Sequence, residues 1–149
     1  MKDYIVKDFT DPRFQDSFKE YFKELEIEFE DWEDLFRQMN EEKDNIAIVR
    51  VDAEETVGFI QFKIDYLENW FFKEEIGFIR EFWVSSKYRN KRQGASLLKS
   101  AEDYFLEKKI YKTILTTYTA SNFYIKQGYI KDDSYKGLNN QDVFVKILK

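Results

Sequence analysis

Residues 87–100 read KYRNKRQGASLLKS. Four cations stand within the first six residues of this stretch, and Gly94 and the start of an apolar helix follow them directly. The N–H groups at a helix start have no intrahelical partner and favour a bound anion, and a glycine lets the backbone approach that anion closely. A basic run is usually a solvated surface, but this one lies between an expected strand and an expected helix, as phosphate-binding loops do. The stretch therefore predicts a loop that binds a phosphate group.

The spacing of this loop argues against two common phosphate-binding motifs. It is neither the G-x-G-x-x-G turn of dinucleotide-binding folds nor a Walker loop, so a dinucleotide or ATP is not the expected ligand. The small residues Ala95 and Ser96 keep the first helical turn uncrowded, and Arg89, Lys91 and Arg92 can add charge-assisted contacts to a phosphate.

Length and composition limit the classes of protein that the chain can belong to. We expect one domain over residues 1–149, and the net charge of −5 is opposite to that of proteins that grip nucleic acid nonspecifically. The sequence has no cysteine and no histidine, which excludes Ser-His-Asp and Cys-His nucleophilic sites, disulfides and the usual structural zinc sites. No apolar run approaches the ~18 residues of a membrane span. A cytoplasmic protein without nucleic-acid or membrane partners is expected.

Hydrophobic periodicity gives the order of the elements. Strands are expected over residues 4–9, 46–51, 56–66, 77–84, 112–118, 129–133 and 142–149. A first helix is expected from Pro12, with Asp11 as its cap, to about Leu25, and a second over 31–39. A third helix should follow the basic loop, with Leu97, Leu98, Ala101 and Phe105 on one face. A fourth is expected over 120–128, with Gly128 at its end. The order β-α-α-β-β-β-α-β-α-β-β predicts an α+β fold with a mixed, mostly antiparallel sheet flanked by helices.

Two segments resemble motifs of the GNAT superfamily of N-acetyltransferases. Residues 84–98, VSSKYRNKRQGASLL, are similar to the acetyl-CoA-binding segment, in which a valine ends a strand and R/Q-x-x-G-x-G/A opens a helix. Arg89 matches the R/Q position and Gly94 the second glycine, whereas Arg92 replaces the first glycine. A side chain at that position crowds a pyrophosphate only if the backbone there needs a positive φ.

The second segment is residues 119–130, TASNFYIKQGYI, which resembles the family pattern A-x-x-F/L-Y-x-x-x-G-F/Y. The matching positions are Ala120, Phe123, Tyr124, Gly128 and Tyr129. Thr117 replaces an asparagine that many members carry. Both motifs are in the family order, so the chain is identified as a member with a GNAT-type fold.

The resemblance implies acetyl-CoA as co-substrate, no metal, and a set of site residues. Val84 N–H would polarise the acetyl oxygen, and Tyr124 would protonate the departing thiolate, although a buried tyrosine can also be only a packing residue. The cofactor-binding positions that it implies are Phe82, Trp83, Val84, Arg89, Asn90, Lys91, Arg92, Gln93, Gly94, Ala95, Thr117 and Tyr124.

Glu81 is the candidate general base, because several family members carry an acid three residues before the valine. Strand alternation would put Ile79, Glu81 and Trp83 on one face, toward either a helix or the acceptor pocket. A structural salt bridge for Glu81, or a base acting through water, is an alternative.

The acceptor is expected to be a small amine or a polyamine. Residues 24–34, ELEIEFEDWED, are densely acidic and would attract a cation, although a solvated helix–loop–helix face has the same composition. A peptide N-terminus or lysine is the alternative acceptor, and a non-catalytic CoA-binding sensor or a nucleic-acid module using KYRNKR are alternative functions. The apolar residues 70–72 would wall the acceptor pocket, pack in the core or form a homodimer contact.

Overall fold

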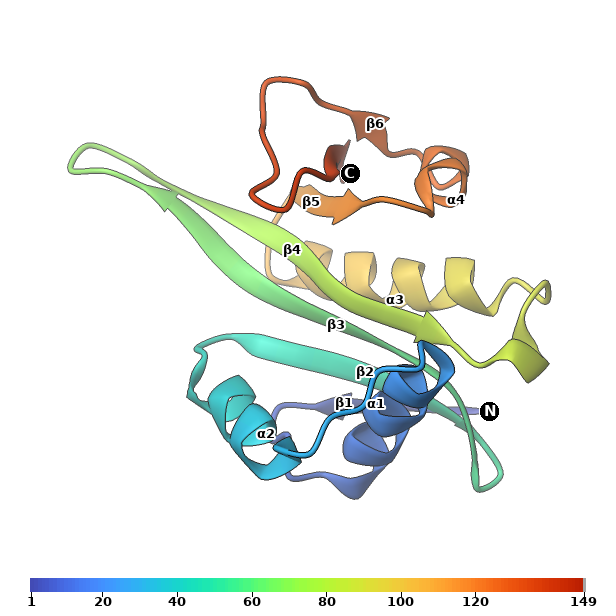
Figure 1. The fold of residues 1–149 in the computed structure, drawn as a ribbon. Helices are drawn as coiled ribbons and strands as arrows, with labels where there is room; N and C mark the ends of the chain where they lie inside the picture. The colour runs from blue at the N-terminus through green and yellow to red at the C-terminus, as the bar shows by residue number, and fades with distance from the viewer. Residues whose placement is uncertain (149) are drawn as a thin grey trace.

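A seven-stranded mixed sheet runs through the computed structural model, which describes residues 1–148 (Figure 1). Its strands are β1 (Lys2–Val6), β2 (Asn45–Asp52), β3 (Glu55–Glu68), β4 (Lys73–Val84), β5 (Lys112–Thr117), β6 (Ile130–Lys131) and β7 (Asp142–Ile147). The helices are α1 (Pro12–Glu24), α2 (Trp32–Glu41), α3 (Gln93–Glu107) and α4 (Ser121–Lys126), with a 3-10 turn at Ser86–Tyr88. The spatial order is β1-β2-β3-β4-β5-β7-β6, and only β4 and β5 pair in parallel. The expected fold class and element order are confirmed.

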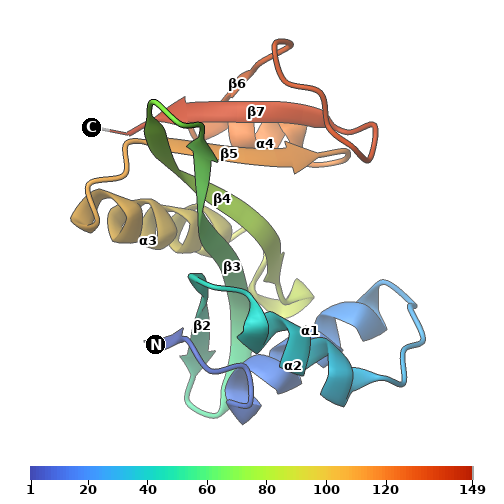
Figure 2. The same ribbon diagram turned by 90° about the vertical axis from the view of Figure 1, so that its left-hand side faces the viewer.

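Two apolar clusters hold the helices against opposite faces of the sheet. In the first, the predicted apolar face of α3, from Leu97 to Phe105, is buried against β3 and β4 residues that include Phe62 and Ile79. In the second, α1 and α2 bury aromatic rings such as Phe18 against Phe59 of β3. Figure 2 shows α1 and α2 on the far side of β3 from α3.

The ends of two helices confirm their predicted capping residues. The Asp11 carboxylate accepts a hydrogen bond from the Arg13 N–H at 2.9 Å, directly before α1. After α4, Gly128 adopts a φ of +94°, which glycine tolerates without steric cost. The N–H of Gly128 bonds to the Ile125 carbonyl and that of Tyr129 to the Tyr124 carbonyl, each at 3.0 Å, which is a Schellman end.

Several strand boundaries differ from the sequence-based expectation. β1 ends at Val6 because Phe9, expected at the end of the strand, is fully buried against Phe14 of α1 instead. β6 contains only Ile130 and Lys131. The sequence also predicts a connection over residues 69–75, NWFFKEE, and its length is wrong: β3 and β4 stay paired as far as Glu68 and Lys73, so only residues 69–72 form the turn. The Asn69 side chain stabilises the turn between them, because its Oδ1 accepts hydrogen bonds from the N–H groups of Phe71 and Phe72.

Candidate functional site

The centre of the site is the place where β4 and β5 separate. In the described residues these strands pair only at Gly77–Thr113 and Phe78–Ile114, although β4 continues to Val84. Figure 2 shows the end of β4 bending away from β5. The Ser85 N–H donates to the Val57 carbonyl of the neighbouring ladder at 2.8 Å, so alternation turns the N–H of Val84 toward the open edge. An open strand edge can bind an extended polar chain through its backbone groups.

The start of α3 lies beside this opening and carries two unusual backbone conformations. Asn90 and Arg92 both have a φ of +61°, and Arg92 is the residue directly before the helix. A left-handed backbone costs a residue other than glycine roughly 1–2 kcal/mol, although asparagine tolerates it better. Arg92 therefore adopts the left-handed backbone conformation that a glycine at this position would adopt without steric cost. Its side chain lies at one end of a cavity of about 730 Å³ that runs beside α3 past Ser96 and Lys99.

In the described part of the chain, two of the four cations of the basic loop form ion pairs, and the other two do not. Lys87 pairs with Glu55 at 2.8 Å, and Tyr88, which is buried, donates a hydrogen bond to the same carboxylate, so this end of the loop is anchored to the β2–β3 turn. Arg89 pairs with Glu24 of α1 and also donates to the Val84 carbonyl at 2.9 Å. Within residues 1–148, neither Lys91 nor Arg92 forms an ion pair. These two cations are therefore free to contact an anion at the helix start.

A β-bulge in β4 decides where Glu81 points. Ile60 pairs with Phe82 and Phe62 with Ile79, so β4 carries one extra residue at this place. The bulge makes the expected common face of Ile79, Glu81 and Trp83 wrong. Ile79 packs on the α3 side, whereas Trp83 packs on the α1 side and Glu81 accepts a hydrogen bond from the Tyr21 hydroxyl of α1 at 2.8 Å.

A second hydrogen bond joins the end of α1 to β4. The Trp83 indole N–H donates to Glu24 at 3.0 Å, parallel to the bond between Tyr21 and Glu81. Burial opposes ionisation of Glu24, but hydrogen bonds from Trp83 and Arg89 outweigh it and lower the pKa of this carboxyl. Sequence reasoning assigned no role to Tyr21 and named Glu24 only as part of the acidic segment. The one available signal was their spacing of three residues, which places both on one face of a helix.

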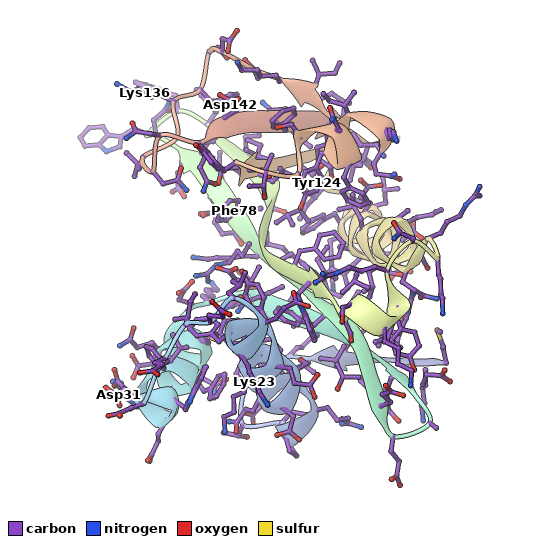
Figure 3. The ribbon with its side chains drawn as sticks, turned by 45° about the vertical axis from the view of Figure 1, so that its right-hand side comes forward. Lys23, Asp31, Phe78, Tyr124, Lys136 and Asp142 are labelled. Carbon is purple, nitrogen blue, oxygen red and sulfur yellow. The ribbon has the colours of Figure 1, made fainter. Side chains whose placement is uncertain are left out.

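Tyr124 comes to the same place from α4. Its side chain is buried, and its hydroxyl has no hydrogen-bond partner in residues 1–148. Burial and then the negative charge of Glu81 raise the pKa of Tyr124 to about 12, so the hydroxyl keeps its proton at neutral pH. Tyr124 lies on the β5–β7 side of β4, and the labelled Lys23 lies on the α1 side (Figure 3).

The neighbours of Tyr124 connect α4 to β4 and α3. The Phe123 ring packs edge-on against Phe82 of β4, with 6.0 Å between the ring centroids. A Cβ added at Gly94 would lie 3.5 Å from the Phe123 ring, an ordinary van der Waals contact. Thr117 has a local role, since its hydroxyl accepts the Ala120 N–H at 3.1 Å before α4. The sheet end, the α3 start and α4 therefore meet around Phe123, the residue before Tyr124.

A fully buried amide lies next to the bulge. Gln61 of β3 has an exposed fraction of 0%, and neither its Nε2 nor its Oε1 has a partner in the described residues. It pairs with Ala47 across the ladder, on the α1 side of the sheet. A buried polar group without a partner costs about 1–3 kcal/mol, so this amide is suited to a bound water or ligand.

The acidic segment 24–34 lies between α1 and α2, close to the end of α1 that carries Tyr21 and Glu24. Among the acidic residues of this segment, only Glu24, with Arg89, and Asp34, with Arg37, form ion pairs within the described chain. The other carboxylates, Glu26, Glu28, Glu30, Asp31 and Glu33, are all exposed. They are not neutralised locally and give this side of the site a negative potential.

The part of the chain that the structure describes, residues 1–148, contains no group of three or more acidic, histidine or cysteine side chains arranged to hold a metal ion. None of its helices is both long and apolar enough to cross a membrane.

An open strand edge, a helix start with free cations, and a buried tyrosine that keeps its proton near the charge of Glu81 suit an acyltransferase of the N-acetyltransferase type. The chain belongs to the acetyltransferase (GNAT) family, whose profile matches residues 5–129. No match was found among curated proteins.

Solved structures with the same fold are distant in sequence. A predicted acetyltransferase from Clostridium acetobutylicum, solved with acetyl-CoA, has a TM-score of 0.76 at 15% identity, over 93% of this chain and 95% of its own. An aminoglycoside 6'-N-acetyltransferase complexed with coenzyme A has a TM-score of 0.73 at 16% identity, over 99% and 97%. The NatC complex bound to Gag peptide and CoA has a TM-score of 0.67 at 18% identity, with 100% coverage of both chains.

Proposed function

We propose that the protein transfers the acetyl group of acetyl-CoA to a primary amine, preferably a small amine or polyamine, within a ternary complex. The observation that carries this proposal is that the open edge of β4 beyond Phe78 lies beside an α3 start whose cations Lys91 and Arg92 have no ion pair in the described residues. The charge of Glu81 on the same strand raises the pKa of Tyr124, which keeps that hydroxyl protonated.

The residues of the loop and of β4 suit acetyl-CoA. The N–H groups of Gln93, Gly94 and Ala95 at the α3 start would bind the pyrophosphate, and Lys91 and Arg92 would add charge. The backbone of β4 from Phe82 through Trp83 to Val84 would pair with the pantetheine arm, with Thr117 across the opening on β5. Arg89 and Asn90 shape the loop, and Arg89 also ties it to α1 through Glu24.

The chemistry assigns one role to each remaining group. The amine nitrogen bonds to the thioester carbon, the C–S bond breaks, and the sulfur leaves with the electron pair. Glu81 takes the amine proton, directly or through a water held beside Gln61, and the Val84 N–H stabilises the oxyanion. The Tyr124 hydroxyl donates a hydrogen bond to the negative charge that develops on the departing sulfur.

The exposed carboxylates of residues 24–34 favour a cationic acceptor, and an aminoglycoside, the substrate named for one similar structure, is such an amine. A peptide acceptor is the alternative, since the NatC complex of the same fold was solved with a peptide. A CoA-binding sensor without turnover is a third possibility, and tight CoA binding with no thiol release from any amine would favour it.

Thiol release during acetylation of polyamines, aminoglycosides, amino acids and peptides tests the proposal. We expect turnover with polyamines or aminoglycosides, and a KM for the amine that rises with salt because charges are screened beyond ~10 Å at 0.1 M. The Glu28→Gln/Glu30→Gln variant should reduce this salt dependence, whereas the Glu107→Gln control at the end of α3 should not. A neutral preferred acceptor, or a KM independent of salt, would contradict the cationic assignment.

The Gly94→Val variant tests the cofactor loop. The space around Gly94 accepts a Cβ, so the fold should persist, but the side chain should obstruct the closest approach to the pyrophosphate. CoA binding should weaken by about tenfold to a hundredfold if the clash costs roughly the 1–3 kcal/mol of an overpacked contact. Calorimetry with CoA measures this effect, and Ser100→Val, six residues further along α3, is the control. Unchanged affinity with Gly94→Val would remove the loop from the cofactor site.

A further inference from the structure

The β3–β4 hairpin projects beyond the rest of the sheet as a two-stranded arm, which we define as residues 65–76 (Figure 1). β2 reaches only as far as Asn45, opposite Lys63, and the pairing of β5 begins opposite Gly77. In the described chain, neither edge of the arm is therefore paired with another strand. Isolated two-stranded hairpins are marginally stable in water, and open edges are templates for pairing with another chain.

The tip of the arm presents aromatic side chains to solvent. Trp70 is 99% exposed, Phe71 93% and Phe72 60%, and Leu67 is also exposed. The tip is an ordered turn, because the Asn69 carboxamide accepts the N–H groups of Phe71 and Phe72 at 2.7 and 3.1 Å. An exposed patch of large apolar side chains that is contiguous in this way marks an interaction site.

We propose that this arm is a dimerisation element and that its tip packs against the arm of a second copy about a twofold axis. A second copy supplies an aromatic surface and an unpaired strand edge together, which suits both features of the arm. The arm carries four acidic side chains, Asp65, Glu68, Glu74 and Glu75, and one cation, Lys73, so the aromatic tip and the open strand edges, and not charge, are what favour a second copy.

A lipid surface suits the arm less well than a second copy does. Hydrocarbon offers no hydrogen bonds to the unpaired edges, and each unsatisfied backbone group there costs several kcal/mol.

The area available is sufficient for a dimer of moderate affinity. Each buried aromatic side chain contributes about 150–250 Å², so three from each copy bury on the order of 1,000 Å². This is close to the lower limit of about 1,200 Å² for specific interfaces, and the flanking strand edges add to it.

The proposed interface is remote from the site. β4 extends over 12 residues from Lys73 to Val84, so at ~3.3 Å per residue Lys73, next to the tip, lies up to about 36 Å along the strand from Val84. Disruption of the arm should therefore leave acetyl transfer and CoA affinity unchanged, so the test of the dimer is independent of the proposed function.

Sedimentation velocity of the full chain over ~1–200 µM tests the proposal, because this range covers the affinity expected of so small an interface. The wild type should pass from monomer to dimer within it. Trp70→Ser/Phe71→Ser should weaken the dimer at least ~100-fold, as loss of central aromatic contacts does. Ile130→Ser, which removes an exposed apolar side chain from the opposite edge of the sheet, is the matched control and should dimerise like the wild type.

Three outcomes would overturn the proposal. The wild type could stay monomeric over the whole range, the double variant could dimerise like the wild type, or the wild type could stay monomeric and sediment with neutral phosphatidylcholine vesicles. The last outcome would assign the arm to lipid. Circular dichroism and CoA binding of the double variant exclude misfolding as the cause of a lost dimer.

Discussion

Replacement of Glu81 by glutamine should lower kcat by roughly 10²–10⁴-fold and leave CoA affinity and folding nearly unchanged. The amide has the shape of the carboxylate, and its oxygen can still accept the hydrogen bond from Tyr21, which the wild type makes at 2.8 Å. It cannot take a proton from the amine. Steady-state kinetics on the preferred amine, with calorimetry of CoA binding, separates the chemical step from cofactor affinity.

The Glu81→Gln variant also tests whether the charge of Glu81 acts on Tyr124. The charge of Glu81 is one of the two causes that raise the pKa of Tyr124, so Glu81→Gln should lower that pKa from about 12 toward the ordinary value. NMR titration of ring-labelled tyrosine measures the shift. Glu75→Gln is the matched control, because Glu75 lies on the same strand but within the arm. If kcat stays at the wild-type level while the Tyr124 pKa falls, Glu81 is beside the site but is not the base.

The element order was predictable because each helix buries one apolar face and the apolar residues repeat at the matching period. Leu97, Leu98, Ala101 and Phe105 are buried as expected. The arm was not predictable, because residues 70–72, WFF, are apolar and the local pattern cannot distinguish an exposed tip from a buried connection. Exposure depends on where neighbouring strands end, which only the assembled sheet determines.

Local and nonlocal parts of the candidate site differ in the same way. The basic loop and the segment around Tyr124 are each continuous in sequence, so their motifs are visible there. The bond between Tyr21 and Glu81 joins residues 60 positions apart, and the bulge that turns Glu81 toward α1 has no local signature. Alternation was therefore a reliable guide within the regular ladder and failed at the bulge.

Replacement of Tyr124 by phenylalanine should lower kcat by about 10²-fold, the low end of general acid catalysis. With a pKa of about 12, Tyr124 is a weaker acid than a thiol, whose pKa is near 8.5. Full proton transfer to the thiolate is therefore uphill, and the hydroxyl acts mainly by donating a hydrogen bond to the charge that develops on sulfur. Folding and CoA affinity should change little, because this hydroxyl has no partner in residues 1–148 whose bond would be lost.

The pH dependence of the wild type distinguishes this role from packing. A raised pKa keeps the Tyr124 hydroxyl protonated at pH 10, where an ordinary tyrosine is half ionised, so loss of this proton should reduce kcat only as the pH approaches 12. In Glu81→Gln the Tyr124 pKa falls, and the residual activity should decline at lower pH than in the wild type. Tyr118→Phe, which alters an exposed tyrosine just before α4, should change neither kcat nor its pH profile. Full kcat in Tyr124→Phe, with an unchanged alkaline limb, would make Tyr124 a packing residue and leave protonation of the sulfur to water.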